Sequence, residues 1–324
     1  MGAAMVDRRW VLGAGLAAAV GAARAAAARA RPRPFDPRDL DGTWDLGSYT
    51  DLQRPAGLPL VLSPEQAEAY EAPLRKMQGM KPSAPGEVGQ AEAEFNDRGS
   101  GLMRVAGQAR SSTIVDPPDG RLPFRPAARA LAANPATAAA RGELDNPETQ
   151  NGPTQCLASV LAGAPMLGAP DANLIQILSV PGQVAILAEK YHDVRIVRLD
   201  PRLKPGADPP GWLGSSVGRW EGASLVVETA GFHAGAINRG QGLVVSPATH
   251  VVERFTRAGA DEIAYAFTVQ DPDLWTRPWR GEMTLRRTKG RLFEYACHEG
   301  NYSLPGILAG ARREEREARA VAER

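Results

Sequence analysis

The chain is poor in the residue types that usually hold metals. Its 324 residues include only two cysteines and four histidines, and its formal net charge is +1. No His-x-His, His-Glu-x-x-His or Cys-x-x-Cys spacing occurs, so no metal signature is present. No Walker loop or dinucleotide fingerprint occurs either, which removes nucleotide chemistry as a leading function. The balanced charge gives no case for nucleic acid, or for an anionic membrane, as the main partner.

An export signal is the first feature that the sequence does contain. Arg8 and Arg9 stand before the alanine-rich apolar stretch 11–23, and small residues that suit cleavage follow. This layout predicts a twin-arginine signal over residues 1–30 and a periplasmic protein. The apolar stretch is shorter than the ~20 residues of a spanning helix, so we expect no membrane span once the signal is removed. An uncleaved anchor is the alternative.

Export changes the interpretation of the two cysteines. In an oxidising periplasm, two lone cysteines of one chain most often pair, so we predict a disulfide bond between Cys156 and Cys297. Closing a loop of that length could stabilise the fold by roughly 4 kcal/mol in the chain-entropy model. A reactive thiol is the alternative, but the two residues lack the close spacing of a redox pair.

Short apolar or alternating runs, separated by glycine, proline and aspartate, dominate the second half of the chain. They predict a mainly β fold, an antiparallel barrel or sandwich, rather than a βαβ sheet. The predicted strands are 41–46, 111–115, 174–180, 184–190, 194–199, 224–228, 251–257, 263–269, 283–287 and 292–298. In strand 263–269, Ile263, Tyr265, Phe267 and Val269 fall on one face at a period of two.

Helices are predicted mainly towards the two ends of the chain. Ser63 and Gln66 form a capping-box pattern before a helix at 64–77, and an alanine-rich helix is predicted over 126–141. We therefore divide the chain into the signal, a partly helical N-terminal segment at 31–155, a β domain at 156–306, and an exposed C-terminal helix at 307–324.

Eight motifs between residues 111 and 312 occur together in this order. They are IVDPPDGRLP (114–123), VPGQV (180–184), HDVRI (192–196), SVGRWEG (216–222), LVVET (225–229), HVVERF (250–255), TRPW (276–279) and EYACHEGNY (294–302). In these motifs the chain resembles a large family of uncharacterised exported bacterial proteins. The resemblance implies export but brings no activity. Members often have aspartate at the position of Ala223, and a histidine in the stretch that corresponds to 201–204, which this chain lacks.

The stretch 293–302, FEYACHEGNY, contains residue types that are rare in this chain and chemically reactive. It holds Cys297, His298 and Glu299, and we expect it to deliver the edge of an active site. His192 and His250 lie in other motifs, each near a carboxylate. If the three histidines converge, they could hold a divalent metal with an open position for water, or they could serve acid–base chemistry without a metal. Capping of strands is the third alternative.

Our functional prediction is an exported enzyme that acts on a small organic molecule by hydrolysis or elimination. His298 and His192 are the predicted general acid and base, and Glu189 and Glu299 are predicted to orient them. A sugar or an aromatic compound is the expected ligand class, and no cofactor is predicted. The predicted substrate-binding residues are His250, Arg195, Arg277, Trp275, Trp279, Asn301 and Tyr302. The alternative is a non-catalytic, lipocalin-like protein whose strands enclose an apolar ligand.

Overall fold

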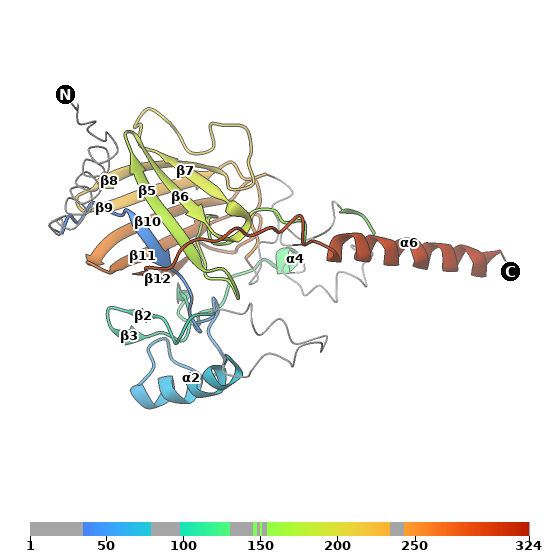
Figure 1. The fold of residues 1–324 in the computed structure, drawn as a ribbon, viewed down its shortest axis with the longest axis horizontal. Coiled ribbons are helices and arrows are strands. Elements are labelled where there is room, and N and C mark those ends of the chain that lie inside the picture. The colour runs from blue at the N-terminus through green and yellow to red at the C-terminus, as the bar shows by residue number, and fades with distance from the viewer. Residues whose placement is uncertain are drawn as a thin grey trace, which may run out of the picture. The chain divides into compact units, whose positions relative to one another are not determined.

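Nine strands of one sheet close into a β-barrel in the computed structural model, which confirms the prediction of a mainly β fold (Figure 1). The structure describes residues 35–78, 98–129, 145–147, 150, 154–233 and 243–323. The predicted signal and most of the predicted helix 126–141 lie outside these residues. Within them, residues 37–323 belong to one unit.

The barrel strands follow one another around the barrel in the order of the sequence, and all neighbouring pairs but one are antiparallel. Around the barrel they are β1 (Gly42–Asp45), β5 (Leu174–Val180), β6 (Gln183–Ala188), β7 (Val194–Arg198), β8 (Ser215–Glu221), β9 (Ser224–Ala230), β10 (His250–Gly259), β11 (Glu262–Gln270) and β12 (Trp279–Arg287). Neighbouring strands pair antiparallel, except that β7 and β8 pair parallel. Trp44 and Asp45 pair with Arg287 and Arg286, and this contact between β1 and β12 closes the barrel.

Alternation along the strands fills the interior of the barrel with side chains. Ile263, Tyr265, Phe267 and Val269 of β11 are all buried, as the period of two predicted. A Cβ atom at Gly281 of β12 would lie 2.2 Å from the ring of Phe267, so only glycine leaves room for that ring. Burial of these apolar side chains is the main source of the barrel's stability.

A buried ion pair crosses the interior. Arg195 of β7 and Glu253 of β10 form a bidentate contact, with Nη1–Oε2 at 2.6 Å and Nη2–Oε1 at 3.0 Å, and the two side chains are 2% and 0% exposed. The hydroxyl of Tyr265 donates to Glu253 Oε1 at 2.7 Å. Burial, and then the charge of Glu253, raises the pKa of Tyr265 well above its ordinary value. Arg195 is therefore part of the core, not of an open substrate site.

Residues 158–169, which we call the plug segment, pack against the inward-facing side chains. Leu161, Ala162, Ala164 and Met166 are completely buried in the same apolar cluster as the barrel strands. The backbone N–H of Met166 donates to the Tyr265 hydroxyl at 2.8 Å, which fixes the plug segment to the buried ion pair. Side chains of the plug segment and of the strands thus pack together in one apolar cluster inside the barrel.

A smaller layer covers one end of the barrel. It contains α2 (Pro64–Gln78) and the hairpin of β2 (Arg104–Val105) and β3 (Gln108–Ala109), which share a second apolar cluster around Tyr49, Leu62 and Leu102. Ser63 and Gln66 form the predicted capping box, since Ser63 Oγ accepts the N–H of Gln66 at 3.2 Å and Gln66 Oε1 accepts that of Ser63 at 3.0 Å.

The predicted boundary at residue 155/156 does not divide the structure. β1 belongs to the barrel, and β4 (Ile114–Asp116) pairs with β12 at the end of that strand opposite to β1. The region before residue 156 therefore supplies strands to the same sheet as the region after it. A short helix, α4 (Pro126–Arg129), follows β4 along the chain.

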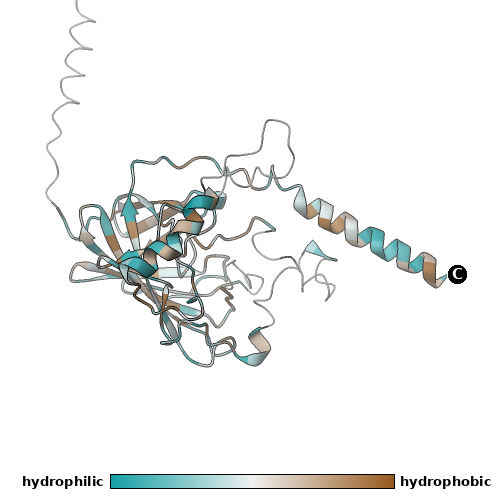
Figure 2. Ribbon diagram, turned by 90° about the horizontal axis from the view of Figure 1, so that it is seen from below, coloured by the Kyte–Doolittle hydropathy of each residue, from teal (hydrophilic) through white to brown (hydrophobic). Residues whose placement is uncertain are grey.

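The C-terminal part departs from the prediction. The predicted strand 292–298 does not form, and residues 288–302 run without helix or strand to α6 (Ser303–Ala322). This helix buries only Ala311, and Figure 2 colours its ribbon with both hydrophilic and hydrophobic residues, the hydrophilic ones gathered in its middle. Among the described residues, none of the helices combines the length and apolar composition that a membrane crossing requires.

Candidate functional site

Five consecutive residues between β6 and β7 organise the candidate site. Residues 189–193, which we call the hub turn, contain the short 3-10 helix η3 (Lys190–His192). Tyr191 and His192 adopt left-handed backbone conformations, with φ of 62° and 54°. Such values are uncommon for residues other than glycine, and they persist where surrounding contacts fix the chain.

The hub turn holds the C-terminal segment by side chains instead of by a sheet ladder. Glu189 Oε1 accepts the backbone N–H of Phe293 at 3.3 Å, and His192 Nε2 accepts that of Tyr295 at 3.0 Å. The two N–H groups lie two residues apart along the segment. The two side-chain acceptors replace the carbonyl partners that a neighbouring strand would provide. This is why residues 293–295 are held in place without being a strand, before the chain turns at 297–300.

The other residues of the hub turn make further long-range contacts. Lys190 Nζ forms an ion pair with Asp171 and lies over the rings of Tyr191 and Tyr295, at 5.6 and 5.3 Å from their centroids. Asp193 Oδ2 accepts the N–H of Ser159 at 2.6 Å, at the start of the plug segment. The hub turn therefore joins the C-terminal segment to the barrel interior.

The predicted disulfide bond is present at the same place. Cys156 and Cys297 are joined by an S–S bond of 2.03 Å across 141 residues of sequence. Next to it, Asn301 Nδ2 donates to the carbonyl of Thr154 at 2.8 Å, and Asn301 Oδ1 accepts the N–H of Leu304 at 3.2 Å, in the first turn of α6. Asn301 thus fixes the chain beside the disulfide, and its side chain is already used for that purpose.

These contacts border an open groove of about 1030 Å3, which we call the disulfide groove. Aromatic rings of Tyr191, Phe293 and Tyr295 line it, and the ring of Phe293 is largely exposed. The charged side chains of its lining are four carboxylates and one guanidinium, from Asp45, Asp171, Glu189, Glu294 and Arg291. The lining is therefore aromatic and predominantly acidic.

Two tyrosines of the groove remain protonated over the physiological range. Burial raises the pKa of Tyr191 to about 12, with further contributions from the charges of Asp171 and Asp193. Burial also raises the pKa of Tyr295, whose hydroxyl donates to Asp171 Oδ2 at 3.0 Å. Both phenols are therefore hydrogen-bond donors, not proton acceptors.

A side pocket of about 160 Å3 adjoins the groove behind residues 294–297, and it contains three of the four predicted catalytic residues. His192, His298 and Glu299 line it together, and Glu189 lines the disulfide groove next to it. The side chain of His298 is exposed and has no hydrogen-bond partner among the described residues. His192 differs, because its Nε2 already accepts a backbone N–H and cannot at the same time accept a proton from a substrate.

His250 does not join the other two histidines. It lies at the start of β10, on the outward face, and its Nε2 is 3.5 Å from Glu228 Oε2 of the adjacent β9. The expected convergence of three histidines is therefore wrong. Among the residues that the structure describes, no group of three histidine, cysteine, aspartate or glutamate side chains could hold a metal ion.

Several predicted substrate-binding residues have structural roles instead. Trp275 and Trp279 are 1% and 0% exposed, with ring centroids 6.0 Å apart in the core, so neither lines a groove. Arg277 lies 2.9 Å from Asp116 of β4, and that ion pair joins the chain after β11 to the strand β4. Tyr302 is 84% exposed but does not line the disulfide groove.

Sequence reasoning missed Asp171 and gave Lys190 and Tyr295 no role. All three meet in one cluster, yet they come from separate parts of the chain, and no spacing rule connects them. The only available signal was the run Glu-Lys-Tyr-His-Asp at 189–193, which is unusually rich in polar groups for a connection between two strands.

No protein family, no curated protein and no solved structure matches this chain.

Proposed function

We propose that this protein binds a small organic molecule in the disulfide groove, and that the ligand is a cation. The observation that carries the proposal is the combination of three lining aromatic rings, of which Phe293 is largely exposed, with four lining carboxylates against one lining guanidinium. Organic cations are attracted both by the faces of aromatic rings and by carboxylates. The protein's own Lys190 already lies over two of these rings, beside Asp171, which illustrates the preference of the site for positive charge.

The groove also has the rigidity that a binding site requires. The disulfide bond, the two side-chain acceptors of the hub turn and Asn301 fix the wall from several directions. A wall that is ordered before the ligand arrives reduces the entropy lost on binding.

A matched pair of ligands tests this proposal. We expect choline to bind and its neutral isostere 3,3-dimethylbutan-1-ol to bind at least about tenfold more weakly, as measured by calorimetry at low salt. Phe293→Ala and Glu294→Gln are expected to weaken choline binding several-fold each. Tyr302→Ala, which removes an equally exposed ring outside the groove, serves as the control. Equal affinity for the cation and the isostere would contradict the proposal.

Acid–base catalysis is the second candidate function, and a specific observation favours it. His298 and Glu299 share the side pocket, and neither side chain has a partner among the described residues. Here His298, rather than His192, would transfer the proton in a hydrolysis or elimination. A panel of activated esters and glycosides would test it: turnover should be lost in His298→Gln and kept in His250→Gln. Activity that survives His298→Gln would exclude this role.

We also propose that the protein is exported by the twin-arginine route into the periplasm. The disulfide bond between distant cysteines supports an oxidising compartment. In a bacterium that has this pathway, Arg8→Lys with Arg9→Lys should leave the precursor in the cytoplasm, whereas Arg24→Lys should not. Periplasmic recovery of the double variant would contradict the route.

A further inference from the structure

Another cavity, smaller than the disulfide groove, lies next to the layer of α2, β2 and β3. It shares no lining residue with the disulfide groove. It has a volume of about 340 Å3, which suits a ligand of few atoms. Its apolar part is made by the side chains of Met103, Leu167 and Met283, which are 2%, 1% and 4% exposed. We call it the polar cavity because hydroxyl, amide and charged groups form the rest of its wall.

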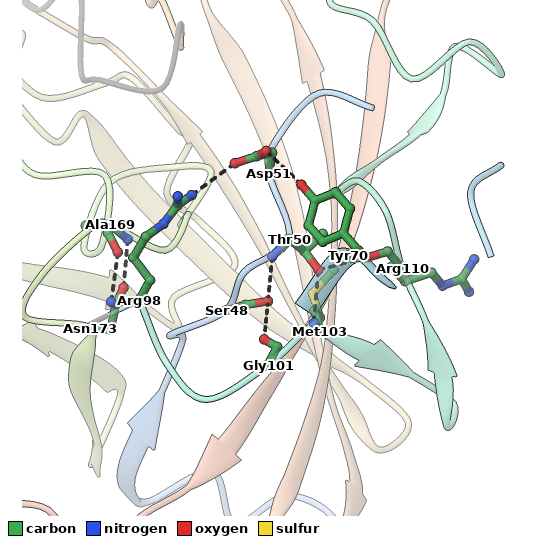
Figure 3. A network of polar contacts seen from close by, with 10 residues as sticks. All are labelled: Ser48, Thr50, Asp51, Tyr70, Arg98, Gly101, Met103, Arg110, Ala169 and Asn173. Atoms are coloured by element: carbon green, nitrogen blue, oxygen red, sulfur yellow. Dashed lines mark hydrogen bonds and ion pairs between the residues drawn. The ribbon is translucent and has the colours of Figure 1, made fainter. Parts of the chain in front are cut away.

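Some of these polar groups are fully used to build the wall (Figure 3). Thr50 Oγ1 donates to the carbonyl of Arg110 at 2.8 Å and accepts the N–H of Met103 at 2.9 Å. Ser48 Oγ accepts the N–H of Thr50 at 3.0 Å. These hydroxyls hold residues 48–50 in place and have little capacity left for a ligand.

Three other groups that line the cavity have unused donors. Thr113 is 4% exposed and lines the cavity, and its hydroxyl has no partner among the described residues. Gln53 Oε1 accepts the N–H of Leu122 at 3.1 Å. The amide nitrogen of Gln53 has no hydrogen-bond partner among the described residues. The Thr113 hydroxyl is therefore open to the cavity and can donate a hydrogen bond to a ligand there.

The third group is a guanidinium that one ion pair places at the cavity wall. Arg98 Nη2 lies 3.0 Å from Asp51 Oδ1, and the other oxygen of Asp51 accepts the hydroxyl of Tyr70 at 3.2 Å (Figure 3). This ion pair uses one part of the guanidinium fork, and the other N–H groups have no partner in the described structure. Burial, and then the charge of Asp51, raises the pKa of Tyr70 to about 12, so the phenol remains a donor to Asp51.

Asp51 also lines the cavity, but its two oxygens already accept hydrogen bonds from Arg98 and Tyr70. The polar side-chain atoms of Arg98, Gln53 and Thr113 that have no partner in the described structure are donors, and the base of the cavity is apolar. From this geometry we infer that the polar cavity binds a short-chain carboxylate. The carboxylate accepts hydrogen bonds from Arg98, Gln53 and Thr113, and the alkyl chain lies against the methionine and leucine side chains. Charge-assisted bonds to a guanidinium are the strongest of these contacts. This site is independent of the cation-binding function proposed for the disulfide groove.

The methionines that line the cavity provide a local readout of this proposal. In full-length mature protein labelled with 13C at the methionine methyl groups, butyrate should shift the signals of Met103 and Met283 in a saturable way. The signals of the buried Met166 and of the exposed Met77, which do not line the cavity, should stay in place. Butyramide has the same size without the charge, and it should bind at least about tenfold more weakly.

Two conservative variants complete the test. Gln53→Glu keeps an oxygen for the N–H of Leu122 but replaces the amide donor with a negative charge, so butyrate affinity should fall about tenfold or more. Thr113→Val keeps the shape and removes the hydroxyl, so affinity should fall several-fold. Glu294→Gln, in the disulfide groove, should leave butyrate binding unchanged. Equal binding of butyrate and butyramide, unchanged affinity in both cavity variants, or no shift at Met103 and Met283 would overturn the inference.

Discussion

The barrel interior and the disulfide groove hold the chain by two different means. In the interior, regular pairing and alternating apolar side chains fix the strands, and the pair of Arg195 with Glu253 places two opposite charges within the apolar packing. Around the groove, the segment 293–297 is held by two side-chain acceptors, one disulfide bond and a few ring contacts. The first arrangement distributes stability over many residues, whereas the second concentrates it in few.

This difference teaches where single substitutions should act. In the interior, the loss of one apolar contact is shared by many neighbours, so the charged pair is the sensitive point. At the groove, the loss of one contact should free a whole segment while the barrel stays folded.

Removal of one partner of the buried ion pair should produce the largest effect. Arg195→Met leaves Glu253 buried without its counter-charge, and we expect a loss of about 3–5 kcal/mol in the free energy of unfolding, measured with urea. Arg195→Met combined with Glu253→Leu should recover most of that loss, because no charge remains buried. Arg313→Ala breaks an exposed ion pair with Glu317 and should change stability by less than about 0.5 kcal/mol. If Arg195→Met lowered the free energy of unfolding no more than Arg313→Ala does, the buried ion pair would not be the sensitive point of the interior.

Removal of the disulfide bond should come second. Cys156→Ser with Cys297→Ser opens a link across 141 residues, and we expect a loss of about 2–4 kcal/mol. The loss should appear mainly as cleavage by protease within 288–302, with the barrel strands still protected. Dithiothreitol should destabilise the wild type to a similar degree and should not affect the double variant further. Uniform loss of protection across the barrel would show that the two regions are not separable.

Loss of a single side-chain acceptor should have a smaller and more local effect. His192→Phe leaves the N–H of Tyr295 without its partner, so hydrogen exchange of the segment 293–297 should accelerate roughly tenfold. His298→Phe changes a neighbouring exposed histidine that accepts no such bond, and exchange there should hardly change. Similar exchange in both variants would mean that the hub turn does not hold the segment.

Alkaline pH should have the smallest effect on stability. It should act through Tyr70 of α2 and through Tyr191 of the disulfide groove. The pKa values of Tyr70 and Tyr191 are raised to about 12 in the folded protein, above the ordinary value of 10.0. Between these values the unfolded chain has lost protons that the folded chain retains, so stability is complete below pH 10 and falls as the pH rises towards 12. Tyr70→Phe and Tyr191→Phe should each reduce the slope of the melting temperature against pH in this range, and Tyr302→Phe should not. An unchanged slope in both variants would contradict the assignment.

The regular part of the fold could be predicted from the sequence, and the physical reason is local. Strands such as β5 and β11 expose one face to the core, so their alternation, together with the Pro181-Gly182 turn, determines the strand positions. The capping box at Ser63 is likewise a signal within four residues. The disulfide followed from the count of two cysteines and the predicted compartment.

The site could be predicted only in part, because its contacts join distant segments. The alternating pattern of 292–298 resembled a strand, but Glu189 and His192 satisfy its N–H groups, and periodicity cannot reveal the source of a partner. Trp275 and Trp279 flank a polar Arg277-Pro278 step that suggested a surface loop, whereas both rings point into the core. His192 and His298 did come together, but His250 faces outward on β10.

Residues 167–174, which we call the partition, run from the end of the plug segment to the first residue of β5 and line both hollows. Residues 167–170 border the polar cavity, and residues 171–174 border the disulfide groove. In the same way, Asp45 at the end of β1 borders the disulfide groove, and the next residue, Leu46, borders the polar cavity. Asn173 ties this partition to Ala169 through two hydrogen bonds, of 2.7 and 2.8 Å. If an occupant of one hollow moved the partition and so changed affinity in the other hollow, the second occupant would change the affinity of the first by the same factor, as thermodynamic reciprocity requires.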